Sequence, residues 1–120
     1  MSSTTSFYAN MNCENDANRV ASIVKRLAAN RTPDYPTEIE RFVAGIEIDG
    51  NTLKIENSYS LMCCTFCEWI PQIMTEIAMW DFGAFTMDAW HESESCGYEA
   101  QCNGRVFKNG KFRMSFYQHE

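Results

Sequence analysis

Three tight-turn sequences constrain the fold of this chain more than any other feature. Glycine follows aspartate or asparagine in Asp49-Gly50, Asn103-Gly104 and Asn109-Gly110. Such pairs favour the short turns that join antiparallel strands, because these residues tolerate a positive φ. Apolar and polar residues alternate on both sides of the first turn, which predicts strands over about 43–49 and 52–60. The other two turns predict short strands near 97–102, 105–108 and 111–118.

Two segments have the spacing of amphipathic helices. The first begins near Asn15 or Asp16, and its apolar stripe consists of Val20, Ile23, Val24 and Leu27. The second covers about 70–80, with Pro71 in its first turn, because a proline would disrupt a helix already under way. A capping-box spacing predicts a short helical turn over 37–42. Alternation predicts further strands over 5–12 and from Phe85 to Ala89.

The expected order is therefore β-α-β-β-α-β followed by an antiparallel tail. This order is typical of a ferredoxin-like α+β fold, an antiparallel sheet with two helices on one face and here a C-terminal hairpin extension. A length of 120 residues and a hydrophobic fraction of 45% fit a single domain over residues 1–120. The sheet face opposite the helices would be open to solvent or to a partner.

The overall charge narrows the class of partner. A net charge of −6 argues against direct binding to nucleic acid. No apolar run approaches the ~20 residues that cross a bilayer. The first residues lack the basic and apolar parts of a signal peptide, so we expect a cytoplasmic protein with reduced cysteines. Nothing in the sequence calls for a cofactor.

Charge is also segregated along the chain. The fifty residues from Ile55 to Gly104 contain eight acids and no lysine or arginine, and basic charge resumes at Arg105. Such a distribution favours a one-signed surface field, which attracts basic protein surfaces. Four of these acids gather near the strand after Gly83 and its turn, namely Asp88, Glu92, Glu94 and Glu99.

Trp90 lies among these acids, two residues from Asp88 and two from Glu92. It shares parity with Asp88, which predicts that it lies on the polar face of its strand. An exposed tryptophan among carboxylates is typical of a protein-docking patch. We therefore predict a partner-binding site at Asp88, Trp90, Glu92, Glu94 and Glu99. Two alternatives stay open: Trp90 packs under the neighbouring hairpin, or the basic tail neutralises the acids through cross-strand ion pairs.

The cysteines offer a second chemistry. Cys64 and Cys67 have C-x-x-C spacing, and with Cys63 and the following helix the stretch resembles the active-site segment of thioredoxins. The proline spacing, the missing preceding tryptophan and the lack of any proline after Pro71 depart from that family, so we interpret the resemblance as incidental. Zinc would need Cys64 and Cys67 with ligands drawn from Cys13, His91, Cys96 and Cys102, and only one pair is tightly spaced.

No catalytic motif is present. His91 has acids nearby, which suits proton transfer, but no spacing ties it to a nucleophile. We therefore interpret His91 as a strand histidine beside a solvated acidic turn. We therefore expect no enzymatic activity, with a thiol oxidoreductase as the alternative.

The second half of the chain carries one further resemblance. Its helix and strand, followed by Ser95-Cys96-Gly97-Tyr98-Glu99-Ala100 and a glycine-turn hairpin, resemble a ferredoxin-like family of plasmid and phage proteins, and the strand and helix around Asn10-Met11-Asn12-Cys13 fit its layout. The resemblance implies a fold and a mobile-element origin. It favours a non-enzymatic inhibitor of a host nucleic-acid-binding complex, such as an anti-CRISPR protein. The alternative is a thiol-redox or structural-zinc protein centred on Cys63, Cys64 and Cys67, and a homodimer through the open sheet face is compatible with either.

Overall fold

The described residues form an α+β fold with one antiparallel sheet and three helices. A computed structural model describes residues 5–30, 36–56, 61–92, 94–103 and 112–118. Its elements are β1 (Thr5–Asn10), α1 (Glu14–Ala29), α2 (Pro36–Val43), β2 (Ile46–Asp49), β3 (Thr52–Ile55), α3 (Cys63–Ala78), β4 (Ala84–His91), β5 (Cys96–Asn103) and β6 (Phe112–Gln118). The strand expected near 105–108 lies outside the described residues.

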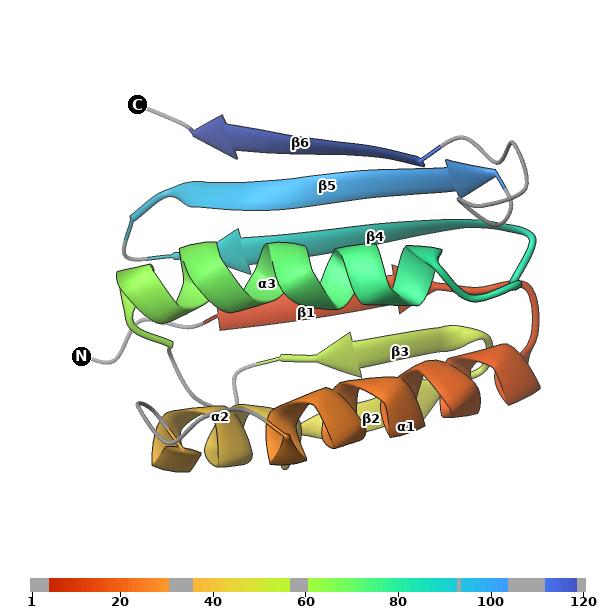
Figure 1. Ribbon diagram of the computed structural model, residues 1–120, viewed down its shortest axis with the longest axis horizontal. Helices are drawn as coiled ribbons and strands as arrows, with labels where there is room; N and C mark the ends of the chain where they lie inside the picture. The colour runs from red at the N-terminus through yellow and green to blue at the C-terminus, as the bar shows by residue number, and fades with distance from the viewer. Residues whose placement is uncertain (1–4, 31–35, 57–60, 93, 104–111, 119–120) are drawn as a thin grey trace.

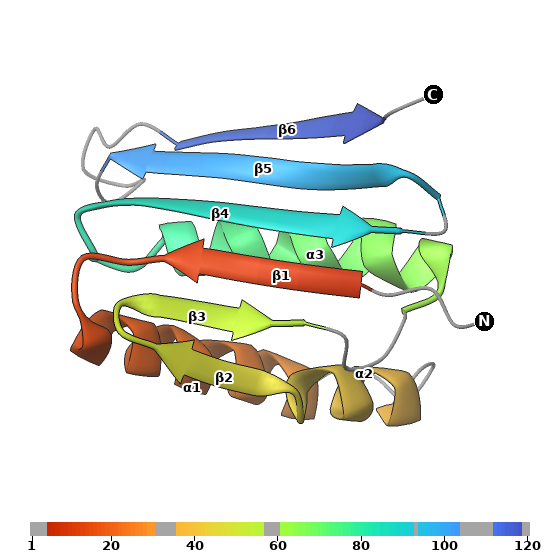
Figure 2. The same ribbon diagram turned by 180° about the vertical axis from the view of Figure 1, so that it is seen from behind.

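The six strands follow the spatial order β2-β3-β1-β4-β5-β6, and every neighbouring pair is antiparallel. Helices α1 and α3 lie on one face of the sheet, in front of it in Figure 1 and behind it in Figure 2, and α2 lies beside the β2 edge. The α+β class and the antiparallel sheet are therefore confirmed. The short helix expected over 37–42 is present as α2, and β6 corresponds to the strand expected near 111–118. The six-strand order differs from that of a simple four-stranded ferredoxin-like sheet.

The first hairpin turn is confirmed, although its strands are shorter than predicted. Asp49 pairs with Thr52, so Gly50 and Asn51 form the turn, and Gly50 has a φ of +61°. The main chain of Asn51 bonds that of Met11, and its side chain donates to the Met11 carbonyl at 2.7 Å. β2 begins only at Ile46 because α2 extends to Val43 and its last turn binds the amides of the two residues that follow.

Helix α3 departs most from the prediction. It begins at Cys63, and Pro71 lies well inside it rather than in its first turn. An interior proline has no N–H to give to the carbonyl four residues earlier, which here belongs to Cys67. The hydroxyl of Tyr98 on β5 donates to that carbonyl at 3.4 Å. A bond from the sheet thus replaces the missing helical bond, so the proline does not end the helix.

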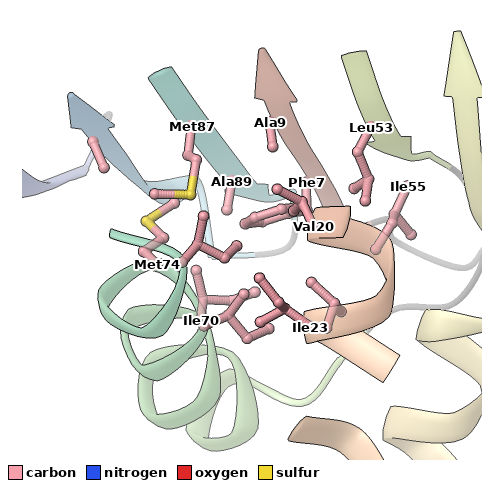
Figure 3. Close-up of a cluster of buried hydrophobic side chains, with 14 of the residues drawn as sticks. Phe7, Ala9, Val20, Ile23, Leu53, Ile55, Ile70, Met74, Met87 and Ala89 are labelled. Carbon is pink, nitrogen blue, oxygen red and sulfur yellow. The ribbon is translucent and has the colours of Figure 1, made fainter. Parts of the chain in front are cut away.

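The core lies between the sheet and the two long helices. Alternation on β1 and β4 turns Phe7, Ala9, Met87 and Ala89 towards the helices. The stripes of α1 and α3 meet them with Val20, Ile23, Ile70 and Met74 (Figure 3). These side chains are all at least 95% buried. Removal of this apolar surface from water is the main force that holds the helices on the sheet.

Candidate functional site

The structure brings three of the five predicted site residues together. Asp88 on β4 and Glu99 on β5 are directly paired, and Trp90 is two residues further along the same face of β4. This is the face away from the helices, which we call the open face. Glu92 and Glu94 are exposed in the β4–β5 turn, beyond the end of these strands. They therefore border the site and are not part of its centre.

A polar hollow of about 420 Å³ lies over β4, β5 and β6 on the open face. Asp88 and Glu99 line it, together with the side chains of four residues that the sequence did not single out: Thr86, Gln101, Arg113 and Ser115. Alternation along each strand indicates which residues share a face. The registers Glu99–Ser115 and Gln101–Arg113, which bring β6 to the hollow, are visible only in the structure.

Two carboxylates, those of Asp88 and Glu99, lie directly opposite each other in the hollow. Carboxylates placed directly opposite each other on neighbouring strands repel and destabilise the sheet. Asp88 receives a hydrogen bond from the Tyr117 hydroxyl at 3.0 Å. Arg113 also lines the hollow, yet among the described residues no salt bridge within 4.0 Å joins it to Asp88 or Glu99. The described part of the basic tail therefore leaves both carboxylates able to receive an external cation.

Trp90 is half-buried because Tyr117 stacks on it. The two rings are 5.6 Å apart and inclined by only 19°. Trp90 and Tyr117 pair from opposite sides with Gly97 of β5, so the rings meet above a residue without a side chain. Trp90 lies on the polar face of β4, as its parity predicts. It is also covered by Tyr117 of β6, which matches the alternative in which it packs under a neighbouring strand. Glycine at position 97 is what allows the contact.

The pKa values of two tyrosines on the open face are raised by burial and by nearby carboxylates. Burial raises the pKa of the Tyr8 hydroxyl to about 12, helped by a hydrogen bond to Glu56 and by the charges of Glu56 and Asp88. The pKa of Tyr117 is raised further, first by burial and then by the hydrogen bond to Asp88 and the charges of Asp88 and Glu99. Both phenols are therefore held in the neutral form on this face.

These shifts predict how stability depends on alkaline pH. The folded chain binds the Tyr8 proton more tightly than the unfolded chain, whose tyrosines titrate near 10. The stabilisation is fully present below that pH and is lost as the pH rises through about 12. In urea titrations between pH 9 and 12 we expect Tyr8→Phe to show a shallower loss of stability than the parent protein. Equal slopes would contradict the assignment.

The described cysteines of α3 and β5 lie in different environments. Cys64 and Cys67 are exposed at the start of α3, whereas Cys96 and Cys102 are buried on the helix side of β5. Burial, and then the nearby Cys67, raise the pKa of the Cys96 thiol. Among the described residues, no group of three or more His, Cys, Asp or Glu side chains is placed to hold a metal ion.

His91 is buried between β4 and the start of α3, where both ring nitrogens have backbone partners. It is 2% exposed and lies edge-on to Phe66, with ring centroids 5.1 Å apart. Its Nε2 is 2.6 Å from the Leu61 carbonyl, and its Nδ1 accepts a bond from the Glu94 amide at 3.3 Å. A carbonyl requires a donor and an amide requires an acceptor, so this geometry fits the neutral Nε2–H tautomer. His91 is the last residue of β4 and lies beside the exposed turn with Glu92 and Glu94, as expected. It is itself buried because it shares the parity of Phe85 and Met87.

Leu61 is the buried partner of His91 and anchors the start of α3. Its amide donates to the Thr5 hydroxyl at 3.0 Å, while its carbonyl faces His91. Thr5 and His91 are themselves direct partners on β1 and β4. The carboxylate of Glu38 adds bonds from the Met62 amide and, at 3.3 Å, from the Thr65 hydroxyl. Side chains from two strands and α2 thus fix the point where α3 begins.

None of the described helices is long and apolar enough to cross a membrane. No family model, curated protein or solved structure matches the chain.

Proposed function

We propose that this protein is a small non-enzymatic interaction protein that binds a basic protein surface through the open face of its sheet. The observation that carries the proposal is the opposed pair Asp88 and Glu99, which lines a polar hollow beside the stacked Trp90 and Tyr117. An arginine or lysine of the partner would enter between the two carboxylates. Charge-assisted bonds of this kind are the stronger hydrogen bonds in proteins.

The rest of the open face supports the same class of partner. Its strands present the carboxylates of Glu47, Asp49, Asp88 and Glu99. Lys54 lies between Asp49 and Glu56, with an N–O distance of 3.6 Å to each. The described strands therefore present more anions than cations on this face. The Trp90–Tyr117 stack adds rigid aromatic area, which is favoured at the centre of interfaces.

We further propose a ferredoxin-like unit and an inhibitory role for the fold. The neighbour order β2-β3-β1-β4, with α1 and α3 on one face, supports such a unit, to which β5 and β6 would be added. An acidic sheet of this size suits an inhibitor of a host defence nuclease complex, in the manner of an anti-CRISPR protein. Its carboxylates would occupy positions that phosphates take in a nucleic-acid channel.

A thiol function is the second candidate. Cys64 and Cys67 are three residues apart on α3, and both are exposed. This arrangement makes an oxidised pair chemically accessible. Counting reactive thiols before and after mild oxidation tests it. Loss of two thiols in the parent protein but not in Cys64→Ser would support the redox candidate.

The binding proposal is tested by charge reversal at Glu99. With a hexa-arginine peptide as the probe, we expect Glu99→Lys to weaken binding about tenfold or more, because a like charge then faces the incoming guanidinium. Binding of the parent should also weaken as salt is raised, since the site is partly exposed. Isothermal titration between 25 and 300 mM NaCl measures both effects.

The control is Glu40→Lys on α2, an exposed glutamate that changes the net charge by the same amount but lies in the helix layer. It should bind the peptide almost as the parent does. Equal losses in the two variants would show that only net charge matters, and would overturn the assignment to the hollow.

A further inference from the structure

Strand β6 has the features of a protein–protein edge. It is the last strand of the sheet, and no described element pairs with its outer side (Figure 1). On the side that faces the helix layer, Met114 is 37% exposed and Phe116 is 51% exposed. Helix α3 lies over the middle of the sheet, so these side chains are left partly uncovered (Figure 1). The result is a seven-residue edge strand with an apolar side.

The other edge of the sheet is protected. Strand β2 has only four residues, and two of them, Glu47 and Asp49, are exposed acids. Short length and charge are the usual means by which proteins prevent edges from pairing. Strand β6 contains no proline, lysine or acid, and its one charged residue is Arg113. The β2 edge is therefore protected against pairing with another strand by its short length and its charge, whereas the β6 edge is not.

We propose that β6 pairs antiparallel with β6 of a second copy of this chain, around a two-fold axis at Ser115. In this register Met114 lies opposite the partner's Phe116, and Arg113 lies opposite the partner's Tyr117. A thioether beside an aromatic ring and a guanidinium beside a phenol are both favourable contacts. The strand is thus complementary to itself on both faces, as a two-fold interface requires.

Charge also favours a second copy in this orientation. Within one chain, Arg113 pairs with Gln101, whereas the acidic turn with Glu92 and Glu94 lies at the other end of β5, beside Gln118. Antiparallel pairing brings Arg113 of each copy to the end of the strand where the partner's acidic turn lies. It also keeps the two acidic open faces side by side rather than in contact. A homodimer through the open face would bring like charges together.

The dimer is independent of the proposed function but would extend the binding surface. A two-fold axis normal to the sheet leaves both open faces on the same side. Arg113 and Ser115 of β6 line the hollow, so the partner's Tyr117 would stand beside its outer wall. The two hollows would then lie on one continuous sheet.

A charge-exchange experiment tests both the dimer and its register. Sedimentation equilibrium of the parent should show a concentration-dependent dimer. The variants Met114→Lys/Phe116→Lys and Met114→Glu/Phe116→Glu place like charges opposite each other in this register, so each alone should associate at least about tenfold more weakly. Mixed in equal amounts, they place lysine opposite glutamate and should form a one-to-one dimer.

Met62→Lys is the matched control, since Met62 is 56% exposed at the start of α3, away from β6. It should remain dimeric. Circular dichroism tests whether each variant is folded. If a double variant is unfolded, the single variant Met114→Lys, at a site that is 37% exposed, replaces it in the test of dimerisation. A parent that stays monomeric up to its solubility limit would overturn the proposal. Folded variants that dimerise alone, or a mixture that does not, would overturn this register.

Discussion

Replacing Gly97 with alanine is expected to lower the free energy of unfolding by about 3 kcal/mol, the upper part of the range for overpacking a filled site. An added Cβ would lie 2.3 Å from the Ala89 carbonyl oxygen and 2.8 Å from the Tyr117 hydroxyl. The first contact is with the backbone of a central strand, which cannot move without disturbing the sheet on both sides. The second would displace the ring that covers Trp90.

Urea denaturation measures this loss, and near-ultraviolet circular dichroism reports the Trp90–Tyr117 stack. The matched control is Gly50→Ala, where nothing lies within 4 Å of the added carbon and only the φ of +61° is unfavourable. That variant should lose about 1 kcal/mol. Gly97→Ala/Tyr117→Ala should lose less than the sum of the two single losses, because the clash with the tyrosine is gone but the Ala89 contact stays. A cost at Gly97 no larger than at Gly50 would contradict the close approach.

Replacing His91 with alanine is expected to cost about 3 kcal/mol through a different mechanism. The change leaves a cavity beside Phe66 and removes the donor from the buried carbonyl of Leu61. Thr5→Val leaves the amide of the same residue without its acceptor and should cost about 1–2 kcal/mol. Because both side chains hold Leu61, we expect the two losses not to add.

Hydrogen exchange locates the effect of these two variants. Faster exchange should appear first at Leu61 and Phe66, the residues whose amides bond at the entry to α3. Thr86→Val is the matched control, since Thr86 lies on the same sheet but on the exposed side. A loss spread evenly over all strands, with no preference for the start of α3, would show that His91 does not anchor this helix.

The local pattern of the chain predicts most of its elements but not all of their ends. The stripe of Val20, Ile23 and Val24 and the alternation from Phe85 to Ala89 both identify faces that are buried in the structure. The sequence predicts too late a start for α3, because the rule that places proline in the first turn considers only hydrogen bonds within one helix. The compensating bond comes from Tyr98, which is distant in sequence. Such tertiary compensation is invisible to local rules.

For the candidate site, the sequence predicts which residues of one strand share a face, but not which residues of neighbouring strands lie side by side. Parity placed Asp88 and Trp90 on the polar face, and the same parity would have placed His91 in the core. The pairing of Asp88 with Glu99 and the contribution of β6 depend on strand register, which local sequence does not specify. Glu92 and Glu94 are close to Trp90 in sequence, but the turn carries them past the end of the strands. Proximity in sequence therefore does not place them beside the paired Asp88 and Glu99.

Chemical-shift mapping of the ¹⁵N-labelled protein with a hexa-arginine peptide tests most directly whether the open face is the binding surface. We predict that the largest shifts fall on the amides of 86–90, 97–101 and 113–117, and that Glu99→Lys greatly reduces them at the same peptide concentration while Glu40→Lys does not. Shifts that concentrate on α1, α2 or α3, or that persist unchanged in Glu99→Lys, would contradict the account.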